Sequence, residues 1–218
     1  MPSSFAVSLA MSAAMVTVDP PDLGHLEAAL LTVAEMPAGF ELSAGTDPNV
    51  VEERYGYTDY CGFRRLNPND QTLSGYALHR SFVRDGRSVS MTIGEPGATW
   101  ANATVQDLME QPTMCPEYSD AMQETDYRVT RVPLPGAGTN AAAIAESWSV
   151  VMSEGGLNGA RELTAAVARG DVVATFTTER PRDEPNYVTD AEFAAIVAAG
   201  ARKLDRATTP GTEPGGPT

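Results

Sequence analysis

Two short turn signals fix how the strands of this chain can pair. Asp85-Gly86 stands between two runs of alternating side chains within residues 76–93. An Asp-Gly pair favours the two-residue turn of a β-hairpin, which requires positive φ angles. Gly170-Asp171 stands in the same way between residues 159–169 and 172–179. The sequence therefore predicts two hairpins, and hairpins pair their strands antiparallel.

The alternation within the first hairpin sorts its side chains onto two faces. One face carries Ala77, His79, Ser81 and Val83, and the other carries Tyr76, Leu78, Arg80 and Phe82. Residues 127–134 and 143–154 are also strand-like, with apolar side chains in alternation. Residues 43–60 are polar and contain Pro48, so they predict a loop.

Helical patterns occupy the two ends and the middle of the chain. Asp22 can cap a first helix, whose apolar residues run at helical spacing from Leu23 to Ala34 until Pro37 prevents continuation. A middle helix is expected from Thr99 or Asn102 to just before Pro112, followed by a short helical piece at 115–122.

The last helix has the clearest start signal. Thr189 and Glu192 form the T-x-x-E pattern of a capping box. The apolar positions that follow at helical spacing are Phe193, Ile196, Val197, Ala201 and Leu204. The order of elements predicts an α+β fold, a mainly antiparallel sheet with helices packed on one side.

The chain length fits one domain with short extensions. Its 218 residues divide into a body at 22–207, a preceding stretch at 1–21 and a tail at 208–218. The tail is rich in Pro, Gly and Thr and is expected to be disordered. Residues 5–18 are apolar and small, like the central region of a signal peptide, but no Lys or Arg precedes them. The stretch 1–21 is therefore either signal-like or a disordered N-terminus.

The charge balance excludes one class of partner. The chain has 15 Lys and Arg against 29 Asp and Glu, a net charge of −14. Such a protein repels the phosphates of nucleic acids, so nucleic-acid binding is not expected. The apolar N-terminal stretch is shorter than the roughly 20 apolar residues that span a bilayer, so no stable membrane span is expected.

Cys61 and Cys115 are the two cysteines of the chain. They are either two buried thiols or one disulfide. A bridge between them would close a loop of about 55 residues and stabilise the fold by about 4 kcal/mol. It would also require an oxidising compartment.

The sequence lacks the familiar catalytic and cofactor motifs. No Cys and His spacing typical of a metal site occurs, and no G-x-S-x-G, S-x-x-K or H-E-x-x-H. Residues 136–141 match G-x-G-x-x-A, but the run that follows is strand-like, so a flexible loop is favoured over a dinucleotide site. His25 and His79 are interpreted as solvated or half-buried histidines. We expect no metal and no cofactor, and assign no catalytic residue.

Four aromatic residues mark where a ligand groove is to be sought. They are Tyr76, Phe82, Trp100 and Trp148. Trp100 and Trp148 also fit the core of a sheet with a covering helix, and that structural interpretation is the favoured one for both.

The succession of elements resembles a known family. The pieces are LLTVAEMPAGFEL at 30–42, Cys61, SFVRDGRSVSMTI at 81–93, MCPEYSD at 114–120, and VARGDVVATFT leading into TDAEFAAIVAAGARKLDRA. Together they resemble the actinobacterial extracytoplasmic sensor-type domains, which include the PknH-like extracellular domain of membrane kinases and related secreted or lipid-anchored proteins.

The resemblance implies a set of properties. It implies that Cys61 and Cys115 form a disulfide, that the protein is exported to the cell envelope, and that a groove between sheet and helices binds a ligand. The leading hypothesis is an exported, non-enzymatic binding or sensor module for a small envelope molecule, an amphiphile or a protein. The alternatives are a lipid or amphiphile carrier on the same scaffold, a hydrolase with an unrecognised site, and a cytoplasmic docking protein.

Overall fold

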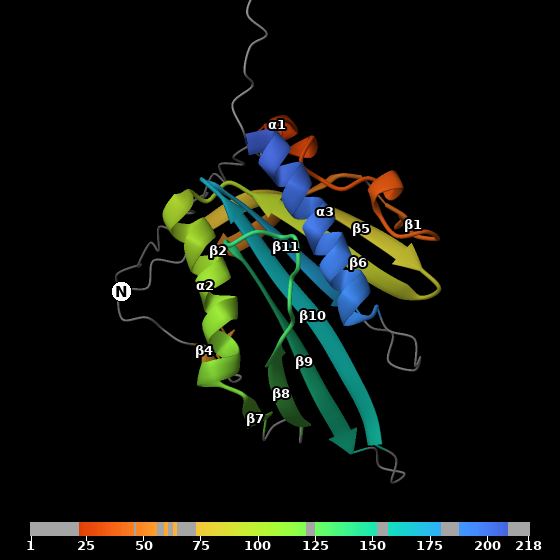
Figure 1. Ribbon diagram of the computed structural model, residues 1–218, viewed down its shortest axis with the longest axis vertical. Coiled ribbons are helices and arrows are strands. Elements are labelled where there is room, and N and C mark those ends of the chain that lie inside the picture. The colour runs from red at the N-terminus through yellow and green to blue at the C-terminus, as the bar shows by residue number, and fades with distance from the viewer. Residues whose placement is uncertain are drawn as a thin grey trace, which may run out of the picture.

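The fold is built on one large antiparallel sheet (Figure 1). A computed structural model describes residues 22–45, 47–55, 59–60, 63–64, 73–120, 125–151, 157–179 and 188–208. The stretch 1–21, most of the predicted tail, and Cys61 lie outside these residues. The predicted α+β class with a mainly antiparallel sheet is confirmed.

Nine strands form the sheet in the order β1-β5-β6-β11-β10-β9-β8-β7, with β2 also paired to β5. Their bounds are β1 Glu41–Leu42, β2 Asn49–Tyr55, β5 Leu73–Arg84, β6 Arg87–Gly94, β7 Glu117–Asp120, β8 Thr125–Arg131, β9 Ala141–Val151, β10 Leu157–Arg169 and β11 Val172–Glu179. The strands β3 Asp59–Tyr60 and β4 Phe63–Arg64 form a separate pair. The helices are α1 Gly24–Glu27, the 3-10 turn η1 Val33–Glu35, α2 Ala98–Met114 and α3 Asp190–Thr208.

Both predicted hairpins are confirmed. β5 pairs with β6 up to Arg84 and Arg87, and the turn residues Asp85 and Gly86 have φ angles of 50° and 74°. β10 pairs with β11 up to Arg169 and Val172, and Gly170 in that turn has a φ of 58°. Positive φ is the conformation for which Gly and Asp are preferred at these turns.

One face of the sheet packs against α1, η1 and α3. The buried strand residues on this face alternate with those on the other face, as the pleat requires. We call this cluster the α3-side core; its strand residues are Leu78, Phe82, Val89, Met91, Ile93, Ala143, Ala145, Leu163, Ala165, Val167, Val172, Ala174 and Phe176. From α3 it receives the predicted set Phe193, Ile196, Val197, Ala201 and Leu204. The amphipathic pattern of the last helix is therefore confirmed.

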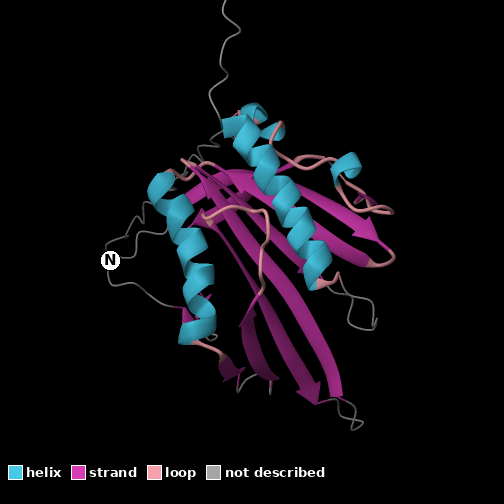
Figure 2. Cartoon of the chain, in the orientation of Figure 1, coloured by secondary structure: helices cyan, strands magenta, loops and turns pink. Residues whose placement is uncertain are grey.

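The other face packs against α2. Here Ala142, Ala166, Ala168 and Val173 of the sheet meet Ala101 and Val105 of α2, together with Tyr55 from β2. We call this cluster the α2-side core. The prediction that all helices pack on one side is wrong, because the central strands bury side chains on both faces and each face needs a cover. Figure 2 shows the two long helices lying against the strands.

The first predicted helix is broken into α1 and η1. Leu31, between them, uses its backbone groups elsewhere: its N–H donates to Met91 Sδ at 3.4 Å and its carbonyl accepts from Arg80 Nη1 at 2.9 Å. These groups are unavailable for helical hydrogen bonds, so the helix cannot continue through Leu31. The apolar spacing therefore predicted the burial of Leu23, Leu26 and Leu30 correctly. It was wrong about the helix and about Val33 and Ala34, which are exposed.

Three further local predictions are wrong. The middle helix continues through Pro112 to Met114, where Arg131 donates to the Met109 carbonyl at 2.9 Å and holds the last turn. The expected helical piece after Cys115 is instead β7, which pairs with β8. The expected loop at 43–60 contains β2, an edge strand whose Glu52 is exposed. Charged side chains are normal on an edge strand and hide its alternation.

The start of α3 uses half of the predicted capping box. The Glu192 N–H donates to Thr189 Oγ1 at 3.2 Å. The Glu192 carboxylate instead pairs with Arg84 of β5 at 2.8 Å. The box residue thus ties the helix to the first hairpin.

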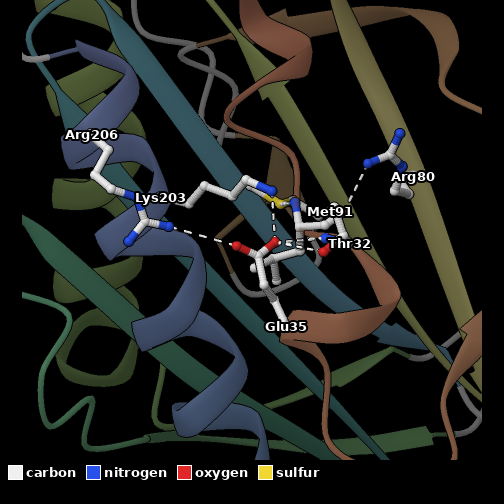
Figure 3. A network of polar contacts seen from close by, with 7 residues as sticks. Thr32, Glu35, Arg80, Met91, Lys203 and Arg206 are labelled. Carbon is white, nitrogen blue, oxygen red and sulfur yellow. Dashed lines mark hydrogen bonds and ion pairs between the residues drawn. The ribbon is translucent and has the colours of Figure 1, made fainter. Parts of the chain in front are cut away.

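A polar network fastens the N-terminal segment to α3 (Figure 3). The Glu35 carboxylate accepts hydrogen bonds from the Thr32 N–H at 2.9 Å and from Lys203 Nζ at 2.6 Å. Arg206 lies 3.6 Å from the same carboxylate. Burial on its own would raise the pKa of Glu35, but the bonds from Lys203 and Thr32 and the charge of Lys203 lower it below its ordinary value of 4.5.

This network predicts an acid-sensitive contribution to stability. Because the folded-state pKa of Glu35 is lowered, its contribution is complete above about pH 4.5 and is lost as the pH falls through the folded-state pKa. Glu35→Gln should lower the free energy of unfolding at neutral pH by about 1–2 kcal/mol and flatten its fall below pH 4.5. Urea unfolding at several pH values measures both effects, with Glu27→Gln at an exposed site as control. An unchanged acid dependence in Glu35→Gln would contradict this assignment.

Tyr55 places a buried hydroxyl in the α2-side core. The residue is 4% exposed, and its Oη has no hydrogen-bond partner among the described residues. Burial, with the nearby charge of Glu53, raises the pKa of Tyr55 to about 12. A Cβ on Gly94 would lie 1.7 Å from this oxygen, so the hydroxyl occupies the space that only glycine leaves open.

An unpartnered buried hydroxyl destabilises the fold, so its removal should help. Tyr55→Phe is expected to raise the free energy of unfolding by about 1 kcal/mol. Gly94→Ala is expected to destabilise the protein, because the added methyl group meets the Tyr55 hydroxyl. Thermal and urea unfolding measure both variants. A less stable Tyr55→Phe protein would show that this oxygen has a partner in the folded state.

Candidate functional site

The four aromatic residues expected to mark a groove do not come together. Phe82 is 0% exposed within the α3-side core, and Tyr76, on the same face of β5, is 37% exposed. Trp100 lies in the first turn of α2 and packs against the α2-side core. Trp148 lies on β9, on the α2 side of the sheet but level with Tyr127 of β8. Of the four, Trp148 stands among other half-buried aromatic rings.

Trp148 ends a row of three aromatic rings that crosses three strands. Tyr118 of β7, Tyr127 of β8 and Trp148 of β9 are register partners. The two tyrosine rings are stacked, with centroids 4.6 Å apart and planes 4° apart. The Tyr127 and Trp148 centroids are 5.8 Å apart at 38°. We call these three side chains, all half-buried, the aromatic row.

Two carboxylates border the aromatic row. Glu146 of β9 lies two residues before Trp148, on the same face, and accepts a short hydrogen bond from the Tyr118 hydroxyl. Glu162 of β10 is the register partner of Glu146. Like charges directly opposite each other on neighbouring strands are unfavourable. The sheet thus holds acceptor oxygens beside the rings.

The aromatic row lies on a part of the sheet that α2 does not cover. Val129 and Arg131 follow Tyr127 along β8 on the same face of the sheet. Val129 is 3% exposed. Arg131 reaches α2, where it donates to the Met109 carbonyl at 2.9 Å and to Thr113 Oγ1 at 3.1 Å. The helix ends at Met114, and the chain turns into β7. The aromatic row therefore begins where the helix stops covering the sheet.

This arrangement presents aromatic faces and acceptor oxygens side by side. Aromatic faces stack on flat apolar groups, and each such contact is worth about 0.5–1.5 kcal/mol beyond the buried area. The Glu146 carboxylate offers acceptor oxygens to hydroxyl or ammonium donors. Both kinds of group stand on paired strands rather than on a loop, which fixes their geometry before any ligand arrives.

Both histidines lie within hydrogen-bond distance of polar side chains. His79 Nδ1 lies 3.0 Å from Thr92 Oγ1, and its Nε2 lies 2.9 Å from Ser81 Oγ. The Ser81 hydroxyl in turn lies 2.8 Å from Ser90 Oγ, so these groups satisfy one another across the hairpin. A cavity of about 90 Å³ adjoins them. His25 is solvated, 3.1 Å from Glu95.

The glycine-containing segment at 136–141 is not followed by a helix. A dinucleotide site would require a helix there, but the segment leads into β9. Arg169 holds it through a 2.9 Å bond to the Ala137 carbonyl. In the described ranges, no group of three or more His, Cys, Asp or Glu side chains is placed to hold a metal ion. No helix in these ranges is both long enough and apolar enough to cross a membrane.

Cys115 lies at the junction of α2 and β7, 3% exposed. None of the cysteines that the structure describes is a free thiol. Cys61 lies outside the described residues, so its pairing with Cys115 stays a prediction.

No protein-family model matches the chain, and no curated protein matches it. Among solved structures, the chain is similar to the extracellular domain of PknH from Mycobacterium tuberculosis, with a TM-score of 0.45 and 14% sequence identity. The alignment covers 84% of this chain and 98% of that one.

Proposed function

We propose that this chain is an exported, non-enzymatic ligand-binding module that binds its ligand at the aromatic row. The observation that carries this proposal is the stacking of Tyr118 on Tyr127, with Trp148 beside them, on one face of the sheet. Three half-buried rings from three strands form an apolar platform of the kind found in ligand sites, where a few polar groups fix orientation.

The neighbouring groups narrow the ligand class. A ligand that lies on the rings needs a flat apolar face, and the carboxylate of Glu146 favours hydroxyl or ammonium donors at its edge. The net charge of −14 disfavours polyanionic ligands. A small envelope molecule with a ring and several donor groups meets these conditions.

The two tryptophans allow a direct test. Trp100→Phe leaves Trp148 as the fluorescence reporter at the row, and Trp148→Phe leaves Trp100 in the first turn of α2 as a matched control. We expect soluble fragments of envelope glycans, in titration, to change the emission of the first variant and not of the second. Tyr127→Ala should weaken binding about tenfold, which corresponds to about 1.4 kcal/mol. Unchanged affinity in Tyr127→Ala would remove the row as the site.

Export is the second part of the proposal. It is supported by the burial of Cys115 and by its not being a free thiol. Since the chain has only one other cysteine, a bridge within the chain would join it to Cys61. Such a bridge would tie the end of α2 beside the aromatic row to the segment after β2, and it persists in oxidising compartments.

The bridge can be tested on purified protein. Mass spectrometry without reductant should find Cys61 and Cys115 in one linked peptide, with neither thiol alkylated until reductant is added. Reduction should lower the free energy of unfolding by up to about 4 kcal/mol. Two thiols that react with an alkylating reagent in unfolded, unreduced protein would count against both the bridge and export.

A further inference from the structure

A groove lies between α3 and the segment that joins β8 to β9, on the face of the sheet opposite the aromatic row. Its volume is about 530 Å³, within the range of small-molecule sites. One wall is Pro133 and Pro135; the other is a stripe of α3 made of Asp190, Ala191, Ala194, Ala195, Ala198 and Arg202. Asp190 and Arg202 are 12 residues apart, which is about 18 Å along a helix.

The walls favour an aliphatic chain over a peptide. Alanine methyl groups and proline rings provide apolar surface, and proline has no N–H to donate. The backbone of α3 is occupied by its own helical bonds. An extended peptide in the groove would leave backbone groups unsatisfied, whereas a hydrocarbon chain has none to satisfy. The contact between Gly136 and Ala198, where an added Cβ would lie 3.6 Å from the Ala198 Cβ, brings the two walls together.

The charges at the groove are not balanced. Asp190 is neutralised by Arg161, which donates to both carboxylate oxygens at 2.5 and 2.9 Å. Arg202 is exposed and makes no ion pair within the described part of the chain. The other charged side chains of α3 are paired: Glu192 with Arg84, Asp205 with Arg169, and Lys203 and Arg206 with Glu35. The uncompensated charge of the groove is therefore positive, in a protein of net charge −14.

We propose that this groove binds a single-chain anionic amphiphile, with the alkyl chain along Ala191, Ala194, Ala195 and Ala198 and the anionic head at Arg202. Binding here is separate from binding at the aromatic row. The alkyl chain gains from leaving water by about 0.8 kcal/mol for each buried methylene group. The head group contributes less, because Arg202 is exposed, but it selects the sign of the charge.

Laurate, dodecyltrimethylammonium and dodecyl maltoside, each below its micelle concentration, are suitable calorimetric probes because they share one alkyl chain. Laurate should bind most tightly to the wild-type protein. Arg202→Gln should weaken laurate about three- to tenfold and leave dodecyl maltoside unchanged. Equal binding of laurate and dodecyltrimethylammonium, or an Arg202→Gln protein with full laurate affinity, would overturn the head-group assignment.

A groove-filling variant tests the position of the alkyl chain. Ala195 is exposed on α3, so Ala195→Trp should fold and fill the groove, and laurate binding should be lost. Ala207→Trp, also exposed on α3 but outside the groove, is the matched control and should bind laurate normally. Full binding by Ala195→Trp would overturn the proposal. Tyr127→Ala should leave laurate affinity unchanged, so failure of the aromatic row and failure of this groove remain separate results.

Discussion

Helices pack closely against both faces of the central strands, and the rest of the structure depends on this packing. The central strands β9 and β10 carry alanines on both faces, including Ala142 and Ala166 toward α2 and Ala145 and Ala165 toward α3. Small side chains bring a helix axis near the sheet and leave little room for error in packing. At one point the approach requires glycine: a Cβ on Gly200 of α3 would lie 2.4 Å from the ring of Phe176. A glycine inside a helix lowers the stability of that helix, and here it lets α3 lie directly against the Phe176 ring.

Within the described residues, the two candidate regions lie where a helix ends and where a connecting segment runs beside a helix. On one face, α2 ends at Met114 and the aromatic row follows directly. On the other, the connection through Pro133 and Pro135 stands apart from the exposed side of α3. Both candidate binding regions therefore lie at the edges of the helices. Between them, packed side chains cover the sheet. Phe82 and Trp148, which were expected at a single groove, lie on opposite faces because their strands alternate side chains between the two faces.

The sequence predicted the elements whose signals are local. Asp85-Gly86 and Gly170-Asp171 carry their turn geometry within two residues, and Thr189 begins α3 through a bond to a residue three positions away. It did not predict those that depend on distant partners. Leu31 ends a helical pattern because Met91 and Arg80, about 60 and 49 residues away, take its backbone groups. β7 is a strand because β8 pairs with it, although its residues read equally well as a helical turn.

The same reason limited prediction of the candidate site. Trp148 could be singled out from its residue type. Its place in the candidate site, however, depends on Tyr127 and Tyr118, which become its neighbours through strand register. A one-residue shift of β7 would turn Tyr118 to the opposite face and separate it from both Tyr127 and Glu146. The candidate site thus depends on the pairing of three strands. Next to it, Arg131 of β8 bonds to the end of α2. The side chains of the candidate site are thus brought together next to the contacts that end the helical cover of the sheet.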